Sequence, residues 1–185
     1  MPGHRRSVRL RGHRYAGGLY FVTLCTAGRE PLFGDLVGNG VRLSAAGRVA
    51  RAEWVETLRR PALRPDVFVV MPDHVHLLVG IVAGDEGSGL DEGTARRAPT
   101  VGATVGASGA GSGRRFAHPE AGTLATVVRA YKSAVTRAVN LARVTPGAQV
   151  WQRGYHDRVV RTDREAEHVR RYILENPARA SARRR

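Results

Sequence analysis

Cysteine and lysine are nearly absent from this chain of 185 residues, and each shortage narrows what the protein can be. Cys25 is the only cysteine, so no disulfide can form within the chain. Because Cys25 lies in an apolar run, we expect a small buried side chain. Lys132 is the only lysine, so arginine carries nearly all of the positive charge.

Long apolar runs and acidic residues are also scarce. No apolar run approaches the roughly 18 residues of a membrane-spanning helix, and the arginine-rich start lacks the apolar core of a secretory signal. The 16 acidic residues leave an excess among the 30 lysines and arginines, with a formal net charge of +14. We therefore expect a cytoplasmic protein with a polyanionic partner: DNA, RNA or an anionic membrane surface.

The most informative segment, residues 66–82, reads as two strands joined by a tight turn. Residues 67–71 are apolar and rich in valine, Pro72-Asp73 is a turn pair, and residues 75–82 are apolar again. Side chains alternate along a strand, so His74 and His76 share one face while their apolar neighbours take the other.

The two histidines allow two interpretations. Neighbouring imidazoles are costly to bury without partners, and a shared metal ion removes that cost. Alternatively, His74 and His76 are a pair of exposed strand histidines without a ligand. One strand offers only two ligands, so a metal site needs a third from elsewhere in the chain.

The remaining periodicities predict a mixed architecture. We expect strands at 19–26, 67–71, 75–82 and 155–161, a hairpin within 31–43, and helices at 45–59, 124–144 and 163–175. Ser44 and Thr162 suit the N-caps of the first and last helices, and Asn176-Pro177 is expected to stop the last one. Without the hairpin and the last helix, the order is βαββαβ. This order predicts an α+β, ferredoxin-like sandwich, with an antiparallel sheet and two helices on one face.

The chain length suits a single domain spanning residues 1–185. Residues 84–122 are rich in glycine and alanine and lack apolar periodicity, so we expect a flexible insertion there. The first residues form a basic arm that either lies on phosphates or is a solvated terminus; its arginines are Arg5, Arg6, Arg9, Arg11 and Arg14. Arg129 and Lys132 fall off the apolar stripe of their helix, so we expect them to face a ligand or water.

The last predicted helix carries candidates for the other half of a site. Tyr172 and Asn176 share one helix face, with His168 one turn before Tyr172. The amide oxygen of asparagine suits Mg²⁺ or Mn²⁺, and the phenol of tyrosine can act as a covalent nucleophile. A packed tyrosine and an Asn-Pro helix stop would explain the same residues without a site.

Several separate segments, taken in chain order, resemble one known family. They are Tyr20-Phe21-Val22-Thr23, Met71-Pro72-Asp73-His74-Val75-His76, Tyr131-Lys132-Ser133, Trp151-Gln152 with Tyr155-His156-Asp157, and Tyr172-Ile173-Leu174-Glu175-Asn176-Pro177. On these segments the chain resembles the IS200-like Y1 transposases of the HUH single-strand endonuclease superfamily, in the branch of REP-associated tyrosine transposases. The chain departs from the pattern at Arg158, where the family often has histidine.

The resemblance implies a site and a reaction. Tyr172 would be the nucleophile, on a C-terminal helix added to the sandwich, and His74, His76 and Asn176 would hold Mg²⁺ or Mn²⁺. Single-stranded DNA beside REP-like palindromic hairpins would be cleaved and rejoined through a 5′-phosphotyrosine, with arginines contacting phosphates. The protein would then be nucleoid-associated when bound, without a membrane partner, as a monomer or homodimer.

Two other functions fit parts of the same pattern. A βαββαβ sheet also builds non-catalytic modules that bind single-stranded nucleic acid. A hydrolytic metal nuclease would use water as nucleophile and leave Tyr172 with a structural role. A protein–DNA adduct that survives SDS is expected only for the transposase.

Overall fold

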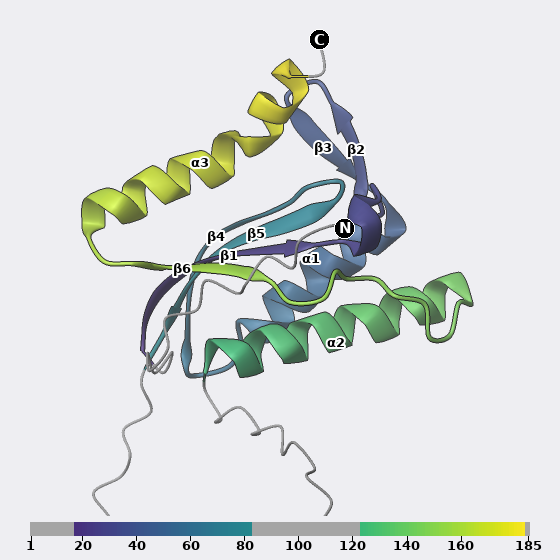
Figure 1. Ribbon diagram of the computed structural model, residues 1–185, viewed down its shortest axis with the longest axis horizontal. Coiled ribbons are helices and arrows are strands. Elements are labelled where there is room, and N and C mark those ends of the chain that lie inside the picture. Colours follow the sequence, from purple (N-terminus) through teal and green to yellow (C-terminus); the bar gives the residue numbers. More distant parts are fainter. Residues whose placement is uncertain (1–16, 83–122, 184–185) are drawn as a thin grey trace, which may run out of the picture.

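The computed structural model describes residues 17–82 and 123–183, in which helices cover both faces of one antiparallel sheet (Figure 1). The elements in chain order are β1 (Gly18–Cys25), η1 (Ala27–Arg29), β2 (Gly34–Val37), β3 (Gly40–Leu43), α1 (Ala45–Thr57), β4 (Leu63–Val70), β5 (His74–Ile81), α2 (Leu124–Arg143), β6 (His156–Val160) and α3 (Asp163–Ala182). The predicted insertion at 84–122 and the basic arm with Arg5, Arg6, Arg9, Arg11 and Arg14 lie outside the described residues. No helix of the described part is long and apolar enough to cross a membrane.

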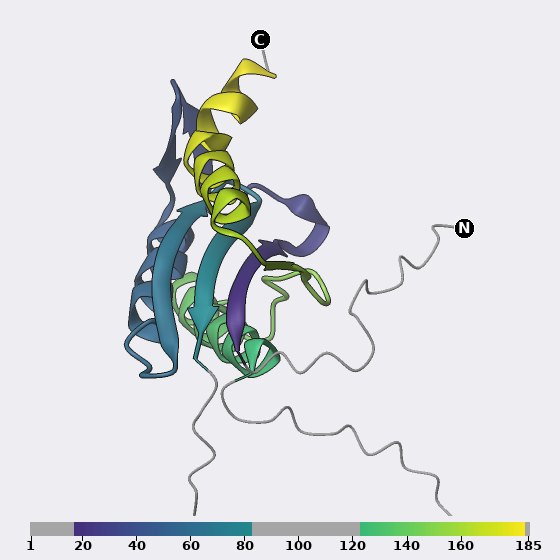
Figure 2. The same ribbon diagram turned by 90° about the vertical axis from the view of Figure 1, so that its left-hand side faces the viewer.

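The main sheet has the strand order β4-β5-β1-β6, with every neighbouring pair antiparallel. Without the separate β2–β3 hairpin and α3, the chain follows the predicted βαββαβ order. Helices α1 and α2 cover one face of the sheet, and α3 crosses the other face, as two perpendicular views show (Figures 1 and 2). The predicted α+β, ferredoxin-like class is therefore confirmed.

The main core lies between the sheet and helices α1 and α2. Strand β5 buries every second side chain there, including Val75, Leu77 and Val79, because the strand alternation turns them away from the histidine face. The rings of Trp54 in α1 and Tyr131 in α2 meet edge to face at 5.3 Å. This burial fixes α1 and α2 to the sheet and leaves the other face free for α3.

The α3 face of the sheet changes character along the strands. Strand register puts one row across the four strands, in the order Val69, His76, Thr23 and His156. The next row continues with Leu78, Phe21 and Arg158. The buried part of α3 packs on the apolar side of this face, through Ala166, Val169 and Ile173. The polar side chains of the first row, His76, Thr23 and His156, therefore lie beside the helix.

Two element boundaries differ from the predictions around proline. The strand expected at 67–71 begins at Leu63 and runs through Pro65, with a register shift between Pro65 and Phe68. Strand β4 lies at the edge of the sheet, where a missing backbone N–H costs no ladder hydrogen bond. An edge position therefore accommodates Pro65 within the strand.

The prediction that Asn176-Pro177 stops the last helix is wrong, because α3 continues to Ala182 with Pro177 inside it. Pro177 is buried, and burial of its ring offsets part of the cost of a lost helical hydrogen bond. On the exposed side, Arg179 and Glu175 form an ion pair across the proline, with Nη2 and Oε2 2.7 Å apart. The added turns reach the β2–β3 hairpin (Figure 1).

Gly47 in α1 gives a test of how closely the hairpin region packs on this helix. A Cβ at this position would collide with the backbone carbonyl oxygen of Phe33, which cannot rotate away. We expect Gly47→Ala to lower the free energy of unfolding by about 1–3 kcal/mol, the usual cost of overpacking. Urea unfolding measures the change.

The direction of this effect is opposite to the ordinary helix preference, which favours alanine over glycine by about 1 kcal/mol. The matched control is Ala52→Gly at an exposed position of the same helix, which should cost about 1 kcal/mol. A Gly47→Ala protein that is more stable than the parent would show that α1 does not lie against Phe33 as described.

Candidate functional site

The two histidines stand at the start of β5, and the turn before them is held by backbone hydrogen bonds. The amide of Thr26 donates to the carbonyl oxygen of Asp73 at 2.9 Å, and the amide of Phe33 donates to that of Pro72 at 2.9 Å. These bonds come from the segment that follows β1. The turn, and with it the first residues of β5, is therefore fixed from outside its own hairpin.

His74 is oriented by the carboxylate beside it. Nδ1 of His74 lies 2.6 Å from Oδ1 of Asp73, whose Oδ2 is 3.3 Å from the guanidinium of Arg29. The hydrogen bond from His74 is the main cause that lowers the pKa of Asp73. An ionised carboxylate only accepts, so His74 donates to it from Nδ1, and Nε2 is the nitrogen left to face His76.

His76 is held on the other side by β1. Its Nδ1 lies 2.9 Å from Oγ1 of Thr23, the residue directly opposite it in the β1–β5 ladder. His76 is 5% exposed, and this burial lowers its pKa to about 3, with the charge of His74 as the next cause. The imidazole is therefore neutral at physiological pH, which is the form that binds metal ions.

The two Nε2 atoms converge at a separation of 3.1 Å. This separation is a hydrogen-bond distance between the two rings, and it is also short enough for both nitrogens to contact one shared cation. Both rings have their other nitrogen on an oxygen partner, Asp73 for His74 and Thr23 for His76. Such outer partners are usual for metal-binding histidines because they fix the ring and its tautomer.

Tyr172 of α3 lies against this pair. Its ring centroid is 5.4 Å from that of His76 and 5.9 Å from that of Phe21, the latter at an interplanar angle of 82°. The structure thus brings together three of the predicted site residues from two elements, His74, His76 and Tyr172. Sequence spacing alone gave no distance between the strand and the helix.

The predicted third ligand, Asn176, lies one turn beyond Tyr172 on α3 and is partly exposed. Within residues 17–82 and 123–183, no group of three or more His, Cys, Asp or Glu residues could hold a metal ion. A site for a metal on His74 and His76 therefore needs another kind of donor. The amide oxygen of Asn176 is chemically suited to that part.

An ion pair that the sequence did not reveal anchors α3 to the edge of the sheet. Arg170 contacts both carboxylate oxygens of Asp66, with Nε–Oδ1 at 2.9 Å and Nη2–Oδ2 at 2.8 Å. Asp66 lies in the register shift of β4, and its Oδ1 also accepts the amide of Val67 at 2.9 Å. This paired geometry fixes the turn of α3 immediately before Tyr172.

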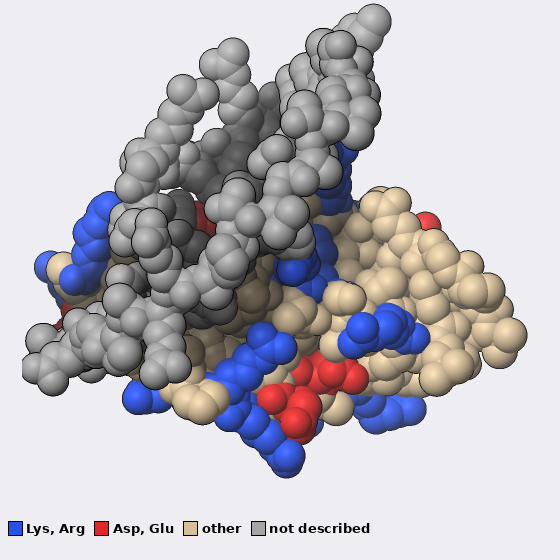
Figure 3. Space-filling model, turned by 90° about the horizontal axis from the view of Figure 1, so that it is seen from below, with Lys and Arg blue, Asp and Glu red and all other residues tan. Residues whose placement is uncertain are grey.

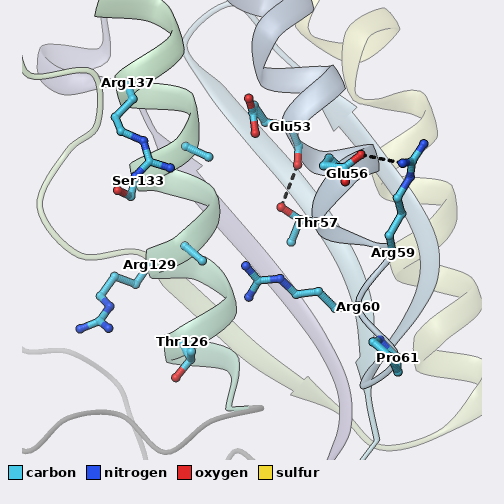
Figure 4. Close-up of a pocket in the computed structure, with 12 residues that line it drawn as sticks. Glu53, Glu56, Thr57, Arg59, Arg60, Pro61, Thr126, Arg129, Ser133 and Arg137 are labelled. Carbon is cyan, nitrogen blue, oxygen red and sulfur yellow. Dashed lines mark hydrogen bonds and ion pairs between the residues drawn. The ribbon is translucent and has the colours of Figure 1, made fainter.

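Arg129 lies in the other layer, away from Tyr172. It lines a groove of about 760 Å³ between α1 and α2, with Arg60 reaching toward α2 and Arg129 pointing away from α1 (Figure 4). Arg59 in the same wall is paired with Glu56 at 3.2 Å. The view from this side shows basic side chains around a smaller acidic patch (Figure 3).

Lys132 is turned toward the loop before β6. Its Nζ donates to the carbonyl oxygens of Gln152 and Gly154 at 2.8 and 2.9 Å, and burial lowers its pKa. Trp151 of the same loop donates its indole N–H back to the carbonyl of Lys132 at 3.2 Å. Lys132 therefore ties α2 to the loop leading into β6, a contact that no sequence pattern indicated.

Comparisons with known proteins agree with this geometry at the level of the fold. No protein-family model matches the chain. An uncharacterized protein of Haemophilus influenzae (strain ATCC 51907 / DSM 11121 / KW20 / Rd) is 29% identical over 180 residues, which cover 94% of this chain and 88% of that protein. A solved structure of a REP-associated tyrosine transposase bound to a REP hairpin is similar with a TM-score of 0.57 and 18% identity, covering 93% of this chain and 73% of that chain. The chain therefore has an IS200/Y1 transposase-like fold.

The buried His76 predicts how stability depends on pH. In the unfolded chain His76 titrates near pH 6.5, whereas in the folded protein it stays neutral down to about pH 3. Between these values the unfolded state binds more protons, so lowering the pH favours unfolding. We expect the free energy of unfolding to fall from pH 6.5 to pH 4.5 by up to about 1.4 kcal/mol per pH unit from this residue.

Urea unfolding at several pH values, in buffer with a chelator, measures this slope. His76→Gln removes the titrating group and should flatten the slope between pH 6.5 and pH 4.5. An unchanged slope in the variant would mean that His76 is not the buried neutral group described.

Proposed function

We propose that this protein cleaves and rejoins single-stranded DNA through a covalent bond to Tyr172. The observation that carries the proposal is the contact between Tyr172 and the histidine pair, with ring centroids 5.4 Å apart for Tyr172 and His76. A nucleophile beside a cluster of cation ligands is an arrangement suited to phosphoryl transfer. The transposase-like fold supports the same conclusion.

In the proposed reaction the phenol oxygen of Tyr172 attacks a backbone phosphorus in line with the 3′ oxygen. A bond forms between the phosphorus and the tyrosine oxygen, and the bond to the 3′ oxygen breaks. The proton of the phenol is lost to the surroundings, and the leaving oxygen gains a proton to become a 3′-hydroxyl. One phosphodiester replaces another, so the reverse reaction can rejoin DNA without an external energy source.

His74, His76 and Asn176 are the residues that would hold Mg²⁺ or Mn²⁺. The fit rests on the 3.1 Å approach of the two Nε2 atoms and on the neutral state of His76. When bound, such an ion neutralises negative charge on the phosphate and on the leaving oxygen. Asp73 and Thr23 keep the two rings in the orientation that the ion requires.

The DNA partner is proposed from charge and from the structural neighbour. That neighbour was solved with a REP hairpin, and a hairpin beside a single strand is the substrate that we propose for this chain. The excess of arginine supplies the phosphate contacts, for which Arg129 and Lys132 and the arginines at positions 5, 6, 9, 11 and 14 are the candidates. Binding should then weaken steeply as the salt concentration rises.

Tyr172→Phe tests the nucleophile. Removing one hydroxyl deletes the attacking atom and leaves the ring in contact with His76 and Phe21, so binding of DNA should stay within about threefold of the parent. The protein is incubated with a hairpin-flanked single strand and Mn²⁺, and adducts are separated on a denaturing gel. The parent should form an SDS-resistant adduct and the variant none.

Tyr155→Phe is the matched control, since it removes a hydroxyl from a partly buried tyrosine that lies before β6. It should form the adduct as the parent does. If Tyr172→Phe still forms the adduct and Tyr155→Phe does not, the nucleophile is Tyr155 and the proposal for Tyr172 is wrong. Cleavage by the parent without any adduct would identify a hydrolytic nuclease instead.

Asp73→Asn tests the metal site with a readout that does not depend on catalysis. The change weakens the acceptor that orients His74 while leaving both proposed histidine ligands in place. We expect the affinity for Mn²⁺ to fall by about 10–100-fold. The decrease of the electron paramagnetic resonance signal of free Mn²⁺ measures the binding. His74→Ala and His76→Ala should bind Mn²⁺ more weakly still.

His168→Ala is the control for this experiment, because it removes an exposed histidine outside the paired residues. It should bind Mn²⁺ like the parent. Parent-like binding in His74→Ala would remove the histidine pair from the metal site.

A further inference from the structure

A cavity of about 400 Å³ opens beside Tyr172, between α3 and the edge of the sheet formed by β1 and β6. Its walls combine aromatic rings with polar side chains. The lining residues that matter here are Phe21 of β1, His156 and Arg158 of β6, and His168 and Tyr172 of α3. The cavity volume falls within the range of small-molecule binding sites.

The aromatic part of the cavity has a defined shape. The rings of Phe21 and Tyr172 stand nearly perpendicular, at 82°, with their centroids 5.9 Å apart. A flat ligand that stacks on one of these rings therefore presents its edge to the other. This arrangement suits a planar ring system better than a flexible chain.

The charge of the cavity does not favour a phosphate. Its arginine, Arg158, is paired with Glu165 at 3.4 Å, and Asp157 lies in the same wall. The remaining polar groups include the exposed imidazoles of His156 and His168, which can donate to or accept from the edge of a ring. The walls therefore fit a flat, uncharged ligand with a polar edge.

The cavity and the histidine pair lie on opposite sides of β1. His74 and His76 belong to β5, while His156 belongs to β6, and both strands pair with β1. Thr23 of β1 lies between His76 and His156 in register. A DNA strand with a phosphate at Tyr172 and the histidine pair thus brings an adjacent nucleotide to the cavity.

We infer that this cavity binds one unpaired nucleobase next to the scissile phosphate, stacked on Phe21, with its edge toward His156 and His168. The inference rests on the proposed action on single-stranded DNA. Stacking on Phe21 supplies affinity for any base, since every base has an aromatic face. The two imidazoles supply a preference among bases. The cavity therefore contributes to the choice of the cleavage position.

The experiment measures binding alone, so it does not depend on the chemistry at Tyr172. The Tyr172→Phe protein, which keeps the ring, is given the tightest-binding strand selected from a pool of hairpin-flanked single strands. Single abasic sites are then introduced at each position of the unpaired flank in turn. One position should lose about tenfold or more in affinity, the usual effect of removing a stacked base.

Variants of the cavity identify which position it holds. Phe21→Leu should weaken binding of the intact strand and abolish the loss caused by the abasic site at that one position. Phe68→Leu is the matched control: Phe68 lies on β4 with its ring 6.4 Å from Trp54, on the other face of the sheet. It should leave the abasic profile unchanged.

His168→Ala provides a second variant that removes only an exposed side chain, so its folding is not in question. It should reduce the spread of affinities among the four natural bases at the identified position by at least threefold. The inference is wrong if two results are found together. In the first, the loss in affinity from Phe21→Leu adds to the loss from the abasic site at every position. In the second, His168→Ala leaves the base preference unchanged.

The two proposals can fail separately. If the protein forms no adduct but Phe21→Leu cancels the effect of one abasic site, the base-binding cavity is supported and the nucleophile is wrong. A protein that forms the adduct through Tyr172 but shows no such cancellation would retain the proposed function and lose the base site.

Discussion

The approach of two imidazole nitrogens to 3.1 Å is the constraint on which the site depends. Two lone pairs cannot face each other at that distance unless a proton or a cation lies between them. Burial of His76, which lowers its pKa to about 3, makes a full positive charge on that ring costly. Asp73 holds the proton of His74 on the far nitrogen of its ring. The space between the two rings is therefore a position for a shared proton or, as proposed above, for a cation.

Because the histidines occupy part of this face of the sheet, α3 packs on a surface that is only partly apolar. The apolar contact is small, with Ala166, Val169 and Ile173 as the buried side chains that α3 contributes to it. The two-point ion pair between Asp66 and Arg170 adds a directional attachment at the edge strand. Helix α3 is thus held by packing in its middle and by charge at the β4 edge, and Tyr172 faces the β1 side of the sheet.

Much of the fold could be predicted from periodicity. The alternation in β5 placed His74 and His76 on one face because Val75, Leu77 and Val79 had to take the other. The apolar stripe of α2 and the caps Ser44 and Thr162 were equally readable, since both depend on neighbours within a few residues. Local patterns of this kind do not require any knowledge of which strands pair.

The parts that could not be predicted depend on contacts between distant segments. Nothing in the sequence fixes the register that puts Thr23 beside His76, because strand pairing is decided by the packing of the whole sheet. The partner of Arg170 depends on an irregularity in β4, and the partners of Lys132 are backbone carbonyls, which every residue carries. The helix stop predicted at Pro177 was wrong for a related reason, since burial of the ring helps decide whether a proline is tolerated, as the edge position does for Pro65 in β4.

Pro177 has a mechanical consequence for the helix in which it lies. A proline cannot donate to the carbonyl four residues earlier, so the carbonyl of Ile173 lacks its usual helical partner. The interrupted bond falls in the turn that separates Tyr172 from Asn176. This turn is consequently less stiff than the rest of α3, which is attached before it by the Asp66–Arg170 pair and after it by contacts with the β2–β3 hairpin. A small bend there changes the distance between the phenol and the amide without undocking the helix.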